Sequence, residues 1–198
     1  MNEAQTTSEL TNLLRRLGLW PYKIPDTSAN HPQGGEPDII FMDIPVIIEV
    51  KMFDPPTGKW ESANFPFRHL RADQRAYLQM FQKDGHHSYL ALGTRHGTAG
   101  STNRPRLVWL IPYHEWLALE EQVLKYRASL PLDRRPRLGE VGRLSLVAAD
   151  RLYQYELNWA DGCWHLPTHH PFAEFVSISQ ERDLHQMREI WRQLKQQN

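Results

Sequence analysis

The chain has 198 residues and a mass of 23.2 kDa, which favours a single domain. Hydrophobic residues make up 40% of it, enough to bury a core and to exclude an intrinsically disordered chain. Its 23 basic and 23 acidic residues give a formal net charge of zero, which argues against a protein that coats nucleic acid through bulk positive charge.

The amino-terminal segment predicts a short helix that stops at Gly18. Its apolar residues recur at helical spacing: Leu10, Leu13, Leu14 and Leu17. Thr6 and Glu9 are spaced as a capping box for this helix. Prolines and glycines are dense from Trp20 to Pro37, so we expect an irregular loop there.

Two short runs rich in isoleucine and valine, 38–43 and 46–51, predict an antiparallel hairpin. A second loop is expected over 53–66, because it contains several prolines and a glycine. A helix should follow and end at Gly85. Four residues mark the apolar face of that helix: Leu70, Tyr77, Leu78 and Phe81.

Two further apolar runs, 88–92 and 107–111, have the length of strands and should extend the sheet that the hairpin begins. Pro112 can open a helix that runs to about Tyr126. The order of elements predicts an α/β domain with a central mixed β-sheet flanked by helices, with its core over about 8–126.

The remaining residues, 127–198, are expected to form a C-terminal extension of the same single domain. A hairpin is predicted from 152–159 and 163–166, because Asp161 and Gly162 accept the positive φ angles of a tight turn. A terminal helix should follow, with Ser177 and Gln180 as its capping box. Its apolar stripe consists of Leu184, Met187, Trp191 and Leu194.

The segment 35–51, GEPDIIFMDIPVIIEVK, suggests a chemical function. In an extended strand, Glu49 and Lys51 project from the same face. If the hairpin turn takes two residues, counting outward places Asp38 directly opposite Glu49, with Cβ atoms roughly 4.5–5.5 Å apart. Facing carboxylates are unfavourable unless a cation joins them, and magnesium accepts one or two carboxylates together with water and a substrate phosphate. Lys51 could then position water for attack on phosphorus, so the pattern predicts phosphodiester hydrolysis.

An alternative is a solvated strand face on which Lys51 simply pairs with one of the acids. Gln74 favours a functional site, because it stands on the apolar stripe of the following helix. A polar side chain on a buried stripe needs a hydrogen-bonding partner, which a metal site or bound phosphate would supply.

These residues together resemble the PD-(D/E)xK nucleases. Pro37-Asp38 is similar to the first motif of that superfamily, Glu49-Val50-Lys51 to the second, and Gln74 to a glutamine that many members carry on the following helix. The layout most resembles the RecU-type Holliday junction resolvases. Glu9 is similar to an acidic residue that some members carry on the first helix.

The resemblance implies a restriction-endonuclease-like core and a Mg²⁺-dependent DNA endonuclease, with Mn²⁺ as a substitute. Asp38, Glu49 and the backbone carbonyl of Val50 would bind the metal, while Lys51 and Gln74 would complete the catalytic set. Structure-selective cleavage and a homodimer are expected from the resolvases. An exonuclease or repair nuclease on the same core, and a non-catalytic nucleic-acid-binding module, remain alternatives.

Basic residues after the hairpin predict where DNA binds: Lys59, Arg68, Arg71 and Arg75. The three arginines recur at i, i+3 and i+7, which would place them on one side of a helix. A solvated helix surface is the alternative, and the stretch 95–106 offers a second basic path.

Other chemistries find little support. The chain has no GxGxxG motif and no P-loop, so we expect no nucleotide cofactor. Cys163, His165, His169 and His170 do not have the spacing of a standard zinc site. A lone cysteine, the absence of an apolar signal sequence and short apolar runs predict a cytoplasmic protein with no membrane partner.

Overall fold

The computed structural model describes residues 3–24, 37–53, 64–94, 107–134, 143–145 and 150–196. The strands are β1 (Pro21–Lys23), β2 (Ile39–Phe41), β3 (Val46–Phe53), β4 (Asn64–Pro66), β5 (His87–Thr94), β6 (Val108–Pro112), β7 (Arg143–Ser145), β8 (Asn158–Ala160) and β9 (Cys163–His165). The helices are α1 (Glu3–Arg16), α2 (Ala72–Lys83), α3 (Tyr113–Ser129) and α5 (Ala173–Gln196), with 3₁₀ turns at Phe67–His69, Leu132–Arg134 and Asp150–Tyr155. Within these residues, none of the helices combines the length and apolar character that crossing a bilayer requires.

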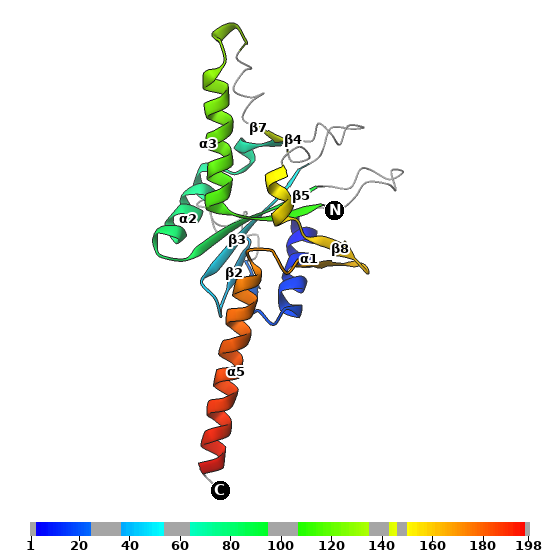
Figure 1. Cartoon of the computed structure of the whole chain (residues 1–198), viewed down its shortest axis with the longest axis vertical. Helices are drawn as coiled ribbons and strands as arrows, with labels where there is room; N and C mark the ends of the chain where they lie inside the picture. Colours follow the sequence, from blue (N-terminus) through cyan, green and yellow to red (C-terminus); the bar gives the residue numbers. More distant parts are fainter. Residues whose placement is uncertain are drawn as a thin grey trace.

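The fold is α/β, with a five-stranded mixed sheet in the order β1-β2-β3-β5-β6 and helices on both sides (Figure 1). β2 and β3 form the predicted antiparallel hairpin, in which Ile39 pairs with Ile48 and Ile40 with Ile47. Continuing this register by one residue places Asp38 opposite Glu49, as the two-residue turn predicts. β5 lies parallel to β3, and β6 is antiparallel to β5, so both predicted strands extend the same sheet.

The side chains of alternate residues of β3 face opposite sides of the sheet. Ile48 and Val50 belong to an apolar cluster with α1 and the first turn of α5. Ile47 belongs to a second cluster with α2 and α3. Glu49 and Lys51 alternate with Val50, so they stand on the α2 side.

Two loop predictions are wrong in part, because strand pairing overrides the local breakers. Tyr22 pairs with Ile40, which makes 21–23 an edge strand where Pro21 can lack an N–H without cost. Likewise, β4 pairs with the distant β7 inside the second predicted loop. The rest of both loops, 25–36 and 54–63, lies outside the described residues.

Both predicted capping boxes are also wrong, because each helix begins earlier. Thr6 lies inside α1, with its hydroxyl donating to Met52 Sδ at 3.1 Å, and Glu9 is one turn further on. Ser177 lies inside α5 and donates to the Ala173 carbonyl one turn back, at 3.3 Å. A hydroxyl can be satisfied inside a helix in this way, so its spacing alone does not mark the start. The stops are as predicted, with positive φ at Gly18 (85°) and at Gly85 (80°).

The C-terminal extension packs into the core of the sheet, to which it contributes Leu157, Trp164 and Phe172. Its tight turn is as predicted, with φ of 51° at Asp161 and 76° at Gly162. The strand expected over 152–159 is wrong up to Leu157, because 150–155 form a 3₁₀ turn that buries Leu152 and β8 begins only at Asn158. α5 then extends away from the sheet in the direction opposite to α3 (Figure 1). Near the start of α5, the Ser179 hydroxyl donates to Asp43 Oδ2 at 2.9 Å, which ties the helix to the turn between β2 and β3.

Candidate active site

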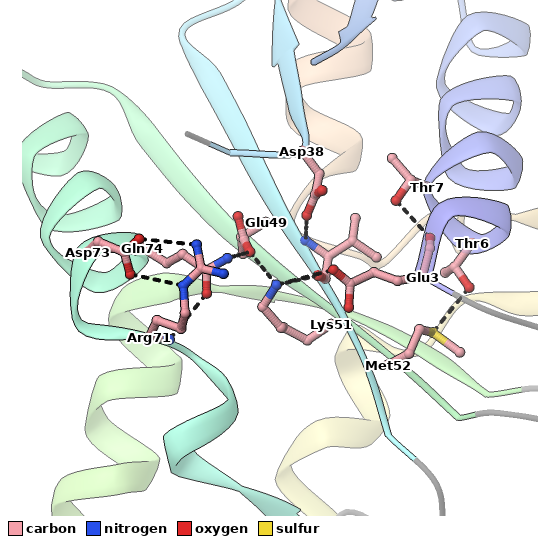
Figure 2. A network of polar contacts seen from close by, with 11 residues as sticks. Glu3, Thr6, Thr7, Asp38, Glu49, Lys51, Met52, Arg71, Asp73 and Gln74 are labelled. Carbon is pink, nitrogen blue, oxygen red and sulfur yellow. Dashed lines mark hydrogen bonds and ion pairs between the residues drawn. The ribbon is translucent and has the colours of Figure 1, made fainter. Parts of the chain in front are cut away.

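Two carboxylates meet on the sheet between α1 and α2 (Figure 2). Asp38 directly precedes β2, and Glu49 lies in the middle of β3, where it is only 1% exposed. The backbone N–H of Val50 donates to Asp38 Oδ2 at 2.7 Å, which fixes the Asp38 side chain against the hairpin. The structure therefore brings together the two acids predicted from the register.

Lys51 lies between acidic groups from two elements. Its Nζ is 2.5 Å from Glu49 Oε1 and 3.3 Å from Glu3 Oε1, and it donates to the Val50 carbonyl at 3.1 Å. The lysine is itself buried. The alternative is correct that Lys51 pairs with one of the two acids, Glu49, but wrong that the strand face is solvated, because both side chains are buried.

Gln74 finds the partner that its buried position requires. From the first turn of α2, its Nε2 donates to Glu49 Oε1, while its Oε1 accepts from the Arg71 backbone N–H at 3.1 Å (Figure 2). The second contact caps the start of α2. Gln74 thus ties Glu49 to α2. Its polar side chain on an otherwise apolar helix face is what identified Gln74 in the sequence.

Glu3, rather than Glu9, is the acid of the first helix that reaches the site. Glu3 opens α1 and contacts Lys51, whereas Glu9 Oε2 accepts a hydrogen bond from Trp164 Nε1 at 3.1 Å. In the sequence, only the position of Glu3 on the amino-terminal side of the leucine stripe indicates that it could belong to this helix. It was missed because the expected capping box put the helix start after it.

Burial sets the protonation of this cluster. Burial and the nearby Asp38 both raise the pKa of Glu49, Lys51 only partly offsets them, and the net value is about 8. Burial also raises the pKa of Asp38, although the Val50 N–H opposes the shift. At Lys51, burial lowers the pKa, but the Glu49 carboxylate outweighs it, and the net pKa is raised. The cluster has fewer positive charges than its carboxylates need to ionise fully.

In metal-free buffer, the free energy of unfolding should fall as the pH rises from about 6.5 to 8. In this range Glu49 keeps its proton when folded but loses it when unfolded, because its pKa is about 8 in the fold against an ordinary value of 4.5. The folded state therefore binds more protons, and stability falls with pH. Buried His170, whose pKa is lowered to about 4 in the fold, still loses a proton near pH 6.5 when unfolded, so it opposes the fall only at the lower end of this range.

Chemical denaturation of the wild type and of Glu49→Gln at the two pH values measures this effect. The variant has no carboxyl group to titrate, so its stability should change less between them. An equal decrease in both proteins would contradict a protonated Glu49.

The structure places the three predicted DNA-binding arginines in different settings. Arg68 lies in a 3₁₀ turn and Arg71 precedes α2, so the three arginines do not share one helix face, and that prediction is wrong. Arg75 forms an ion pair with Glu120, with Nη2 2.6 Å from Oε1, and donates to two backbone carbonyls. Arg71 is exposed and pairs with Asp73 at 3.1 Å. Lys59 lies outside the described residues.

Arg75 is therefore expected to stabilise the fold rather than to bind phosphate. Arg75→Ala would leave Glu120 largely buried without a cation, and breaking such a pair costs about 3 kcal/mol of unfolding free energy. Arg71→Ala, at an exposed position, should cost little stability and should lower the salt dependence of DNA binding by about one unit. Denaturant titrations and DNA binding at several salt concentrations test both. A stable Arg75→Ala protein with a flatter salt dependence would restore Arg75 as a DNA contact.

The oxygen donors of the site fit a hard divalent cation. Asp38 accepts the Val50 N–H, and Lys51, which is paired with Glu49, donates to the Val50 carbonyl, so two carboxylates and one carbonyl belong to the same cluster. Magnesium typically takes one or two carboxylates and completes its shell with water and phosphate. A cation there would stabilise the ionised forms of both carboxylates and so offset the effect of burial, which raises both pKa values. Among the described residues, no group of three or more His, Cys, Asp or Glu side chains is arranged to hold a metal.

Comparisons with protein-family models, with curated proteins and with solved structures find no match to this chain. The α/β class is shared by proteins of many functions. Function is therefore inferred from the residues of the site.

Proposed function

We propose that the protein is a magnesium-dependent endonuclease that hydrolyses phosphodiester bonds in DNA, on a restriction-endonuclease-like core. One observation carries the proposal: Asp38 and Glu49 are adjacent across a hairpin, with the Lys51 ammonium 2.5 Å from Glu49. A structural ion pair needs one acid for one base, whereas this cluster contains an additional carboxylate, that of the half-buried Asp38. Buried acids with raised pKa values beside a lysine are typical of catalytic sites.

Asp38, Glu49 and the Val50 carbonyl would hold the magnesium ion, or manganese in its place. When bound, the ion supplies a Lewis acid that neutralises charge on the scissile phosphate. Lys51 can donate a proton of its ammonium group to a hydrogen bond with the attacking water, which orients the water oxygen. Its positive charge also favours the negative charge that develops on the phosphate oxygens.

The surrounding residues hold this arrangement rigid. Gln74 fixes one oxygen of Glu49 from α2, and Glu3 holds Lys51 from α1. A catalytic group held from two helices stays in the geometry that the reaction needs. This support from both sides of the sheet favours a catalytic site over a module that only binds nucleic acid.

A cleavage assay on four DNAs tests the proposal: closed circular plasmid, linear duplex, single strands and a four-way junction, each with Mg²⁺ and with EDTA. We expect cleavage of the closed circle with Mg²⁺ and none with EDTA. An exonuclease would leave the closed circle intact and degrade the linear DNA. Cleavage in EDTA, or cleavage of none of the substrates, would refute the proposed chemistry.

The resolvase resemblance adds two finer expectations. The four-way junction should be cut in preference to the linear duplex, and the protein should sediment as a homodimer. A monomer that prefers single strands would favour a repair nuclease on the same core.

A further inference from the structure

An exposed apolar stripe lies on the outer strands of the sheet. Trp20 is 69% exposed, Tyr22 53% and Met42 75%. Tyr22 pairs with Ile40 across β1 and β2, and the Met42 N–H donates to the Trp20 carbonyl at 3.3 Å, which continues the pairing. Alternate residues of a strand share a face, so these four side chains form one surface, named here the aromatic stripe. Two exposed aromatic rings beside an exposed methionine indicate a binding surface.

The aromatic stripe leads to the candidate active site. Along the second strand, Met42, Ile40 and Asp38 follow one another on the same face, at about 7 Å intervals. The Ile24 N–H donates to the Asp38 carbonyl at 3.0 Å, so the pairing continues as far as the carboxylate. The surface therefore changes from apolar to acidic at the point where the proposed metal ligands begin.

Tyr22 stands between two hollows. One, of about 500 Å³, is also lined by Ile40, Ile47, Tyr77 and Phe81, and Ile47 is two residues from Glu49 on β3. Tyr77 and Phe81 stack on each other there, with ring centroids 5.1 Å apart.

The other hollow, of about 430 Å³, is lined by Trp20, Met42 and Arg15. Arg15 thus supplies a positive charge at the outer end of the aromatic stripe. At the end nearest Glu49 lies Arg71, an exposed guanidinium that also pairs with Asp73 at 3.1 Å. Aromatic rings between cationic groups are the features by which proteins hold the bases and phosphates of a single strand.

We propose that the aromatic stripe binds an unpaired segment of DNA, with bases stacked on Trp20 and Tyr22 and the strand directed toward Asp38 and Glu49. The proposal rests on the proposed nuclease function and specifies its substrate: DNA that is single-stranded next to the bond to be cut. Bases inside a duplex are stacked on one another and cannot present their faces to a protein ring, so an intact duplex would not use this surface.

Binding of a fluorescent 15-nucleotide oligo-dT, followed by anisotropy in EDTA, tests the proposal without any cleavage. Trp20→Ala and Tyr22→Ala should each weaken binding by about 5- to 150-fold, the range measured for loss of one stacked base. Trp20→Phe and Tyr22→Phe keep a ring and should bind close to wild type. The matched control is Tyr153→Ala, which removes a ring that is 75% exposed on another element. Binding of a 15-base-pair duplex should be unchanged in all variants.

Three results would overturn the proposal. The alanine variants could bind oligo-dT as the wild type does, or could lose duplex binding equally. They could also change the sedimentation coefficient without changing DNA binding, which would make the aromatic stripe a contact between two copies of the chain.

The test is independent of the nuclease proposal. A protein that binds oligo-dT through Trp20 and Tyr22 but cuts no DNA with Mg²⁺ would support the aromatic stripe and refute the nuclease function. A protein that cuts DNA but whose alanine variants bind oligo-dT normally would support the nuclease function and overturn the aromatic stripe.

Discussion

Replacing Lys51 by alanine should reduce the rate of DNA cleavage by about a thousandfold or more, while DNA affinity falls by no more than one phosphate contact is worth. The Lys51 Nζ lies 2.5 Å from Glu49, inside the cluster that would hold the water and the phosphate. An interaction that orients water and stabilises developing charge acts mainly in the transition state, so its loss lowers kcat more than it raises KM.

Single-turnover cleavage and anisotropy on the same DNA separate the two effects. Lys125→Ala is the control, because Lys125 is an exposed lysine on α3 that pairs with Glu121, one turn away on the same helix. Circular dichroism and a melting curve show whether Lys51→Ala remains folded, since it leaves Glu49 buried without its cation. If affinity and cleavage fall together in a folded protein, Lys51 is a binding residue and its proposed catalytic role is wrong.

Asp38→Asn and Glu49→Gln should each abolish detectable cleavage and remove Mg²⁺ or Mn²⁺ binding measured by calorimetry. Both substitutions keep the size of the side chain and remove the charge that a hard cation requires. The fold should survive. In Asp38→Asn, the amide oxygen can still accept the Val50 N–H, and in Glu49→Gln the neutral side chain no longer needs to keep a proton at neutral pH.

Glu9→Gln is the control for this pair. Glu9 is an acid on the neighbouring helix α1 but bonds Trp164 instead of the cluster, so its loss should leave metal binding and cleavage intact. Normal Mg²⁺ binding by both the Asp38 and Glu49 variants would place the metal elsewhere, and an effect of Glu9→Gln equal to theirs would show that the loss is not specific to the site.

Local patterns in the sequence predicted correctly which side chains meet at the centre of the candidate site. The alternation in VIIEVK and a two-residue turn determine the hairpin register, because side chains along a strand have a period of two. That register brings Asp38 opposite Glu49 and places Lys51 on the same face as Glu49. Gln74 could be predicted because a polar residue on an otherwise apolar helix face needs a partner, although the pattern did not say that Glu49 would be that partner.

Contacts between residues far apart in the sequence were decided only by the tertiary structure. Arg75 looked like part of a basic surface until the fold placed Glu120 against it, 45 residues away. Glu3 reaches Lys51 across 48 residues, and the breaker-rich segment at Tyr22 becomes a strand because Ile40 offers it an open edge. Local spacing determines which way a side chain points within its own element. Which partner it meets there depends on how the elements pack, and packing free energy exceeds local preference at each of these positions.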